Sequence, residues 1–190
     1  MGRILGRVGS LVAGAGLVIG LAFASTGCGS SSGLPPLSPA GVKNNRAVSA
    51  LVAATASINA ELERQHRLGG NLSQEIRTKG LTPSLRRRLV RVFEPAVVHF
   101  VNIRRRLDSA RPGADPLLAK TQRTLSLWLA RQVEADRIAV TAQTNAGYLI
   151  RTKRVAPKIA RLTKRLETLS VRVQTKYPGV SNWKFLPNSS

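Results

Sequence analysis

The sequence predicts an all-α fold: an antiparallel four-helix bundle with kinked helices, preceded by a signal peptide and a flexible tether. Aromatic residues make up only 4% of the 190-residue chain, whereas strands favour aromatic and β-branched side chains. Apolar residues recur at steps of three and four along four long stretches, which is the spacing of one helix face. Proline and glycine separate those stretches, and a chain of this length is expected to form one domain.

The N-terminal segment has the layout of a signal peptide. Arg3 and Arg7 are followed by an uncharged apolar run from Val8 to Ala24. That run is at the short end of the roughly 17 to 25 residues that a membrane-spanning helix needs. We therefore predict that residues 1–27 form a signal peptide.

The only cysteine, Cys28, follows this run in the stretch Ser25-Thr26-Gly27-Cys28. The stretch resembles the lipobox of bacterial lipoproteins, although Ser25 stands where a larger aliphatic residue is usual. The resemblance covers residues 1–33 alone and implies nothing about the fold of the remainder. It implies that Cys28 is the lipid attachment residue and the N-terminus of the mature chain. The expected location is then the extracytoplasmic face of the cell membrane, with the protein anchored by lipid.

Two other fates of the N-terminal segment stay open. Ala22-Phe23-Ala24 fits a cleavage site of ordinary secretion, which would leave Cys28 as an unpaired thiol. The apolar run could also remain uncleaved as a membrane anchor.

Residues 28–41 are predicted to form a Gly/Ser/Pro tether, because glycine and serine give flexible chain and proline interrupts helices. A first helix is expected from about Asn44 to Leu68, where Gly69 and Gly70 stop it. Its apolar face consists of Val48, Leu51, Val52, Thr55, Ile58 and Leu62.

A short helix is expected between Asn71 and Gly80, since Asn71 begins a capping-box pattern and glycine can end a helix. Thr82 followed by Pro83 predicts the start of the second long helix. Pro95 removes a hydrogen bond inside that helix and predicts a kink. The apolar face consists of Leu85, Leu89, Val92, Ala96, Phe100, Ile103 and Leu107.

Asp115 followed by Pro116 predicts the start of the third long helix in the same way. Its apolar face consists of Leu118, Thr121, Leu125, Trp128, Gln132, Ala135, Ala139 and Ala142. A fourth long helix is expected to end before Tyr177, and its apolar face consists of Val155, Ile159, Leu162, Leu166, Leu169 and Val173.

Two joints between the third and fourth helices compete. One lies at 145–147, where Gly147 can end a helix, and the other at 153–157, where Pro157 can start one. When the apolar spacing of the fourth long helix is continued towards the N-terminus, it falls about one residue out of register with the apolar face of the third helix. This favours the glycine joint, with Pro157 as a kink, although the register can also drift along one continuous helix.

These bounds give a basic helical bundle over residues 42–177 and a C-terminal tail over residues 178–190. From Ser181 to Ser190 the tail is polar apart from Trp183, Phe185 and Leu186. We expect these three side chains to dock on the bundle rather than to contact a membrane interface.

Metal and catalytic constellations are missing from the sequence. His66 and His99 lie on different predicted helices without a cysteine or a His-x-x-x-His pair beside either, and His99 is expected to be half-buried beside Phe100. One Glu-x-x-His pair occurs, at Glu63 and His66, whereas a di-iron bundle site draws such a pair from each of two helices. The spacing Gly-x-Ser-x-Gly occurs at 29–33, but within the predicted tether and not between a strand and a helix, and no glycine-rich phosphate loop follows a predicted strand. We therefore predict no metal site, no cofactor and no enzyme activity.

Positive charge is the strongest signal in the chain, because 30 Lys and Arg against 9 Asp and Glu give a formal net charge of +21. Basic residues concentrate at 86–91, at 104–106 and along the fourth long helix. In the last set, steps of four, three, four, seven and four place the side chains on one helix face. We call this set the C-terminal basic face: Arg154, Lys158, Arg161, Arg165, Arg172 and Lys176.

The C-terminal basic face has two interpretations. It either binds anionic surfaces or forms a solvated flank whose arginine stems cover the edge of the core. The functional hypothesis is a lipid-anchored binding or scaffolding protein of the bacterial envelope that engages anionic lipids, anionic polymers or an acidic partner. The alternatives are a secreted protein that binds nucleic acid, disfavoured because an exported protein does not meet the chromosome, and an enzyme with an unrecognised site. The sequence does not indicate the oligomeric state.

Overall fold

The computed structural model of the chain describes residues 39–112, 114–180, 183 and 185. Over these residues it contains α-helices, one short 3-10 turn and no strand, so the all-α prediction is confirmed. The elements are α1 (Pro39–Gly69), α2 (Leu72–Lys79), α3 (Pro83–Ser109), α4 (Pro116–Thr141), α5 (Asn145–Lys176) and the 3-10 turn η1 (Pro178–Val180).

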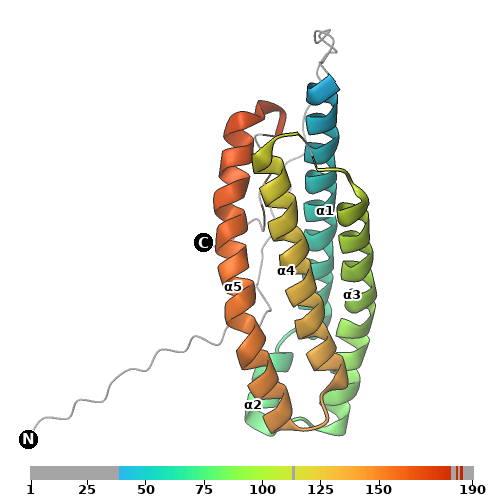
Figure 1. Cartoon of the computed structure of the whole chain (residues 1–190). Helices are drawn as coiled ribbons and strands as arrows, with labels where there is room; N and C mark the ends of the chain where they lie inside the picture. Colours follow the sequence, from blue (N-terminus) through green and yellow to red (C-terminus); the bar gives the residue numbers. More distant parts are fainter. Residues whose placement is uncertain (1–38, 113, 181–182, 184, 186–190) are drawn as a thin grey trace, which may run out of the picture.

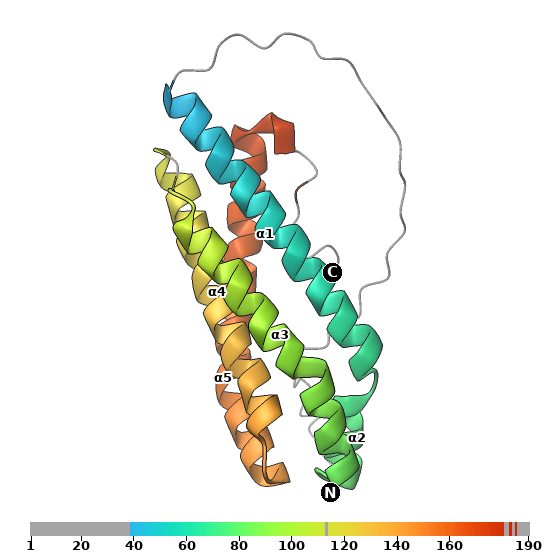
Figure 2. The same cartoon turned by 90° about the vertical axis from the view of Figure 1, so that its right-hand side faces the viewer.

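The four long helices lie side by side, and the short α2 sits at one end of them (Figures 1 and 2). Packing is closest between α3 and α4 and between α4 and α5, while α1 packs mainly against α3. These contacts are consistent with a helical bundle. Figure 1 shows α4 between α3 and α5, which makes α4 the central helix of that face.

The apolar faces predicted for α3 and α4 form much of the core. All seven residues predicted for α3 are buried, and in α4 only Ala135 of the predicted face is half-buried instead. Trp128 of α4, 1% exposed, lies near the middle of the main apolar cluster. Its ring meets Phe100 edge-on at 6.3 Å between centroids, and its Nε1 donates to Thr163 Oγ1 on α5 at 2.9 Å. One large aromatic side chain thus joins α3, α4 and α5.

The C-terminal tail contributes two core residues. Trp183 and Phe185 are both buried, and the ring of Phe185 meets Trp128 edge-on at 5.4 Å between centroids. The Nε2 atom of Gln174 on α5 donates to the Trp183 carbonyl oxygen. Docking of these two aromatic residues is confirmed, and the packed body extends past the boundary predicted at residue 177.

Helix starts follow the predicted caps in two of three cases. Thr82 Oγ1 accepts from the Leu85 amide at 3.3 Å, and Asp115 Oδ1 accepts from the Leu117 amide at 2.8 Å. Asn71 makes no side-chain cap bond, so the capping-box prediction is wrong although α2 is present. The helix α1 begins at Pro39 and therefore includes the last residues of the stretch predicted as tether.

The joint between the third and fourth long helices is at the earlier of the two predicted places. α4 ends at Thr141 and α5 begins at Asn145. The role expected for Gly147 is wrong, because this residue does not end α4 but lies in the first turn of α5, where its amide donates to Thr144 Oγ1 at 3.1 Å. A Cβ at residue 147 would lie 2.9 Å from that oxygen, so glycine is needed there for the close approach of the cap.

The two interior prolines do not end their helices. α3 continues through Pro95 and α5 continues through Pro157. A proline has no amide N–H, so the carbonyl group four residues before it loses its helical hydrogen bond. Those carbonyl groups belong to Arg91 and Lys153, and both residues are exposed, as are the two prolines.

Candidate functional site

The C-terminal basic face lies on α5, where all six of its side chains are exposed. At about 100° per residue, the six positions fall within a sector of about 60° around the helix. Val155, Leu166 and Val173 are buried on the adjoining sector. The structure therefore brings the six predicted residues together on one side of one helix, next to the apolar face that holds α5 in the core.

Lys176 differs from the other five members of the face. Its Nζ atom lies 2.7 Å from Asp115 Oδ2, and the same oxygen accepts from the Tyr177 hydroxyl at 2.6 Å. Burial raises the pKa of Asp115, but hydrogen bonds from Lys176, Tyr177 and the Leu117 amide outweigh it, and the net pKa lies below 3.8. Part of the charge of Lys176 is thus neutralised where the last residue of α5 meets the N-cap of α4.

The other members of the face carry unneutralised charge. Arg154, Lys158, Arg161, Arg165 and Arg172 form no ion pair with any residue that the structure describes. The two other basic concentrations are partly neutralised, because Arg88 pairs with Glu75 at 3.0 Å and Arg104 pairs with Asp108 at 3.4 Å. The five side chains on α5 are therefore exposed cations on one side of a single helix that pair with no described acid.

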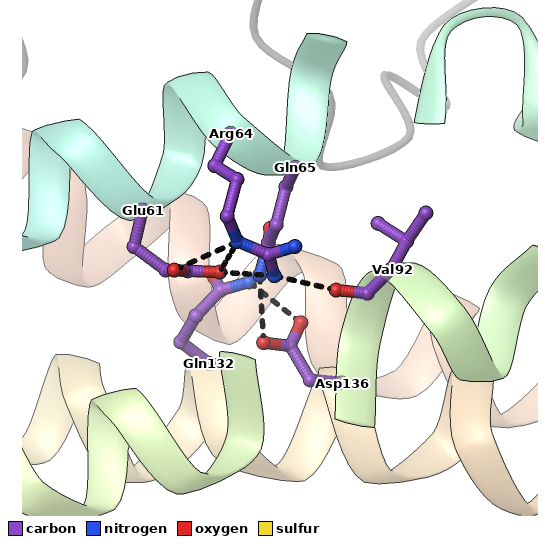
Figure 3. A network of polar contacts seen from close by, with 6 residues as sticks. All are labelled: Glu61, Arg64, Gln65, Val92, Gln132 and Asp136. Carbon is purple, nitrogen blue, oxygen red and sulfur yellow. Dashed lines mark hydrogen bonds and ion pairs between the residues drawn. The ribbon is translucent and has the colours of Figure 1, made fainter. Parts of the chain in front are cut away.

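A buried polar network, which sequence reasoning missed, joins α1, α3 and α4 (Figure 3). Asp136 of α4 is 1% exposed. Its Oδ2 accepts from Gln65 Nε2 of α1 at 3.0 Å, and its Oδ1 accepts from Gln132 Nε2 at 3.1 Å. The Asp136 carboxyl thus links α1 to α4 through two amide side chains.

An ion pair on α1 completes the network. Glu61 is buried, and its Oε1 lies 2.6 Å from Arg64 Nη2. The same Nη2 donates to the Val92 carbonyl oxygen of α3 at 2.7 Å. Arg64 therefore satisfies both a buried carboxylate and a backbone carbonyl of the neighbouring helix.

Burial raises the pKa of Asp136 from 3.8 to about 7. Hydrogen bonds from Gln65 and Gln132 oppose this shift, the negative charge of Glu61 adds to it, and Arg64 opposes it. The carboxyl is sealed inside the packed helices, so its position fits a structural role in joining α1 to α4. One oxygen of the network, Gln65 Oε1, is buried without a hydrogen-bond partner.

No group of three potential metal ligands occurs in the part of the chain that the structure describes. None of the described helices is long and apolar enough to cross a bilayer. His99 is exposed on α3 and not half-buried as expected beside Phe100. Cys28, Leu186, the signal peptide at 1–27 and most of the predicted tether lie outside the described residues.

No family model matches the chain, and neither the curated proteins nor the solved structures give a match.

Proposed function

We propose that this chain is a lipid-anchored protein of the bacterial envelope, on the extracytoplasmic face of the cell membrane, and that its C-terminal basic face binds anionic phospholipid headgroups. The anchoring part rests on the resemblance of the stretch ending at Cys28 to a lipobox. The binding part rests on one observation, the five exposed and unpaired cations on a single side of α5.

We also infer that α1, α3, α4 and α5 form an antiparallel four-helix bundle with kinks at Pro95 and Pro157. In this proposal the bundle follows a signal peptide at 1–27 and a short tether. The packing of α3 on α4, of α4 on α5 and of α1 on α3 supports this arrangement. A flexible tether of about ten residues has an r.m.s. reach of only about 17 Å, so it would hold the bundle close to the lipid surface.

Charge makes the binding energetically reasonable. An anionic leaflet attracts each nearby lysine or arginine by about 1 kcal/mol. The chain carries 30 basic against 9 acidic residues, so internal pairing cannot neutralise most of its cations. Five cations on one face would therefore add several kcal/mol to whatever the lipid anchor contributes, after losses to geometry.

Vesicle binding without the anchor tests the binding part. The chain from residue 29 to 190 lacks Cys28 and should bind vesicles that contain anionic phospholipid but not vesicles of neutral phosphatidylcholine. Binding should collapse between 0.1 M and 1 M salt, because the Debye length falls from about 10 Å to about 3 Å. Co-sedimentation measures both effects, and binding that ignores lipid charge or salt would refute the proposal. Stronger binding to DNA of matched charge density would favour the nucleic-acid alternative.

Metabolic labelling tests the anchoring part. A fatty-acid analogue should label the full chain expressed in a bacterium with lipoprotein processing, because the lipobox resemblance implies acylation of the Cys28 sulfur. The Cys28→Ala variant should carry no label. Equal labelling of the two forms, read from a gel, would contradict the proposal.

A further inference from the structure

A groove beside α4 is lined by arginine side chains from three helices. It has a volume of about 640 Å³, which is within the range of about 300 to 1,000 Å³ typical of ligand sites. Its lining residues come from α3, α4 and α5, and Figure 1 shows α4 between the other two helices. The arginines that line it are Arg104 of α3, Arg137 of α4, and Arg151 and Arg154 of α5.

The charge of this groove is mostly unneutralised. Glu134 is its only acidic lining residue and pairs with Arg131 at 2.7 Å. Arg104 contacts Ser126 and Asp108, whereas Arg137, Arg151 and Arg154 pair with no acid among the described residues. Like charges that line one groove repel one another, and an anion bound among them relieves that repulsion. The planar, forked donors of arginine match a phosphate group in particular.

The groove is also lined by apolar side chains. Of these, Val133, Ile138 and Val155 are buried, and Val101 and Ala130 are half-buried. Two exposed apolar side chains lie one helical turn from lining residues: Val98, 58% exposed, precedes Val101 by three residues, and Leu127, 54% exposed, precedes Ala130 by three. A basic rim beside apolar side chains suits a ligand with an anionic head and an apolar chain.

We propose that this groove is a discrete binding site for one anionic phospholipid, with the headgroup phosphate between Arg137, Arg151 and Arg154 and the start of an acyl chain over Val101 and Ala130. The inference rests on the proposed function and deepens it. Arg154 belongs to both features, so a lipid in the groove sits at one end of the C-terminal basic face.

The test uses the full chain in nonionic maltoside micelles and titrates it with short-chain phosphatidic acid, followed by calorimetry. Inorganic phosphate and short-chain phosphatidylcholine serve as the comparison ligands. One variant, Arg137→Gln with Arg151→Gln, removes two rim charges without touching the C-terminal basic face. The matched control, Arg46→Gln with Arg67→Gln, removes two exposed charges from α1, which does not line the groove.

We expect phosphatidic acid to bind with one-to-one stoichiometry. The rim variant should bind it at least about tenfold more weakly, because each lost charged hydrogen bond weakens binding substantially, while the control should bind as the parent does. Inorganic phosphate and phosphatidylcholine should each bind at least about tenfold more weakly than phosphatidic acid. Circular dichroism should show the same helix content in all three proteins.

Three results would overturn the groove proposal: no saturable binding, equal loss in the rim variant and the control, or equal affinity for inorganic phosphate and phosphatidic acid. Failure of the groove is distinguishable from failure of the proposed function. If the groove fails but the chain from residue 29 to 190 still binds anionic vesicles in a salt-dependent way, the C-terminal basic face alone carries the binding.

Discussion

At the scale of residues, Asp136 is an acidic side chain that is only 1% exposed and lies between α1 and α4. It accepts two hydrogen bonds from neutral amides, and no cation touches it directly, since Arg64 donates to Glu61 and Val92 instead. The protonated carboxyl could donate a hydrogen bond, and Gln65 Oε1 is a buried acceptor without a partner on the same amide. A turn of that amide would then satisfy both groups.

The raised pKa makes the free energy of unfolding depend on pH. Below about pH 3.8 the Asp136 carboxyl is protonated in both states, and above about pH 7 it is ionised in both. Between these values the unfolded chain loses its proton first, so the folded state binds more protons and its stability falls as pH rises. The difference between 3.8 and about 7 corresponds to at most about 4 kcal/mol.

Asp136→Asn should remove this dependence. The variant keeps the shape of the side chain and cannot ionise, so we expect it to unfold at higher denaturant than the parent above pH 7. The difference between the urea midpoints of the variant and the parent should become smaller towards pH 4. Urea unfolding of the chain from residue 29 to 190, followed by circular dichroism across this range, measures the effect.

Asp108→Asn is the matched control, because Asp108 is exposed and forms only a surface ion pair with Arg104. In that variant the free energy of unfolding should depend on pH as it does in the parent. If Asp136→Asn also keeps the parental slope, Asp136 is not the titrating group.

The sequence could not show this network, because the partners are far apart in the chain. Gln65 and Asp136 are 71 residues apart, so their pairing depends on how α1 packs against α4. The only local signal was Gln132, a polar residue on a predicted apolar face with Asp136 four residues later.

At the scale of elements, the apolar periodicity predicted α3 most closely, because its seven buried residues face one side of a helix bounded by Thr82 and a final turn at Ser109. The prediction of α4 was too narrow. Leu129, Val133 and Ile138 are buried outside the predicted face, since α4 packs against both α3 and α5 and needs a wider apolar surface than a helix with one neighbour. Tertiary packing decides that width, and periodicity alone does not.

The contribution of the C-terminal tail to the free energy of unfolding can be measured with one substitution. Phe185 packs edge-on against Trp128 and is buried, so Phe185→Ala should lower the free energy of unfolding by about 3 kcal/mol. Leu127→Ala, at an exposed position on α4, should change it by less than about 0.5 kcal/mol. Chemical denaturation of both variants checks the contrast, and a loss for Phe185→Ala no larger than that of the control would show that the tail does not stabilise the core.

At the scale of the whole molecule, the excess of basic over acidic residues is the property on which the proposed function depends. The sequence predicted the place of the C-terminal basic face on one helix side, since helical spacing alone determines it. It did not predict that Lys176 pairs with Asp115 or that Arg137, Arg151 and Arg154 converge on one groove. Both features require α5 to be placed beside α4, which sequence spacing does not specify.

We propose that the C-terminal basic face, rather than net charge in general, attaches the molecule to anionic surfaces. Two variants of the chain from residue 29 to 190 separate these ideas. Arg161→Glu with Arg165→Glu reverses two unpaired charges on α5, and Arg86→Glu with Arg87→Glu reverses two exposed charges on α3, so both variants have the same net charge. Neither pair lines the groove on α4.

The measurement is co-sedimentation of these two variants and the parent with anionic vesicles at 0.1 M salt. Because each cation near an anionic leaflet contributes about 1 kcal/mol, we expect the α5 variant to bind at least about tenfold more weakly than the parent. The α3 variant should bind almost as well as the parent, with an unchanged helical spectrum in both cases. If the α5 variant binds as tightly as the parent, or if the two variants lose affinity equally, the C-terminal basic face is a solvated flank and the account is wrong.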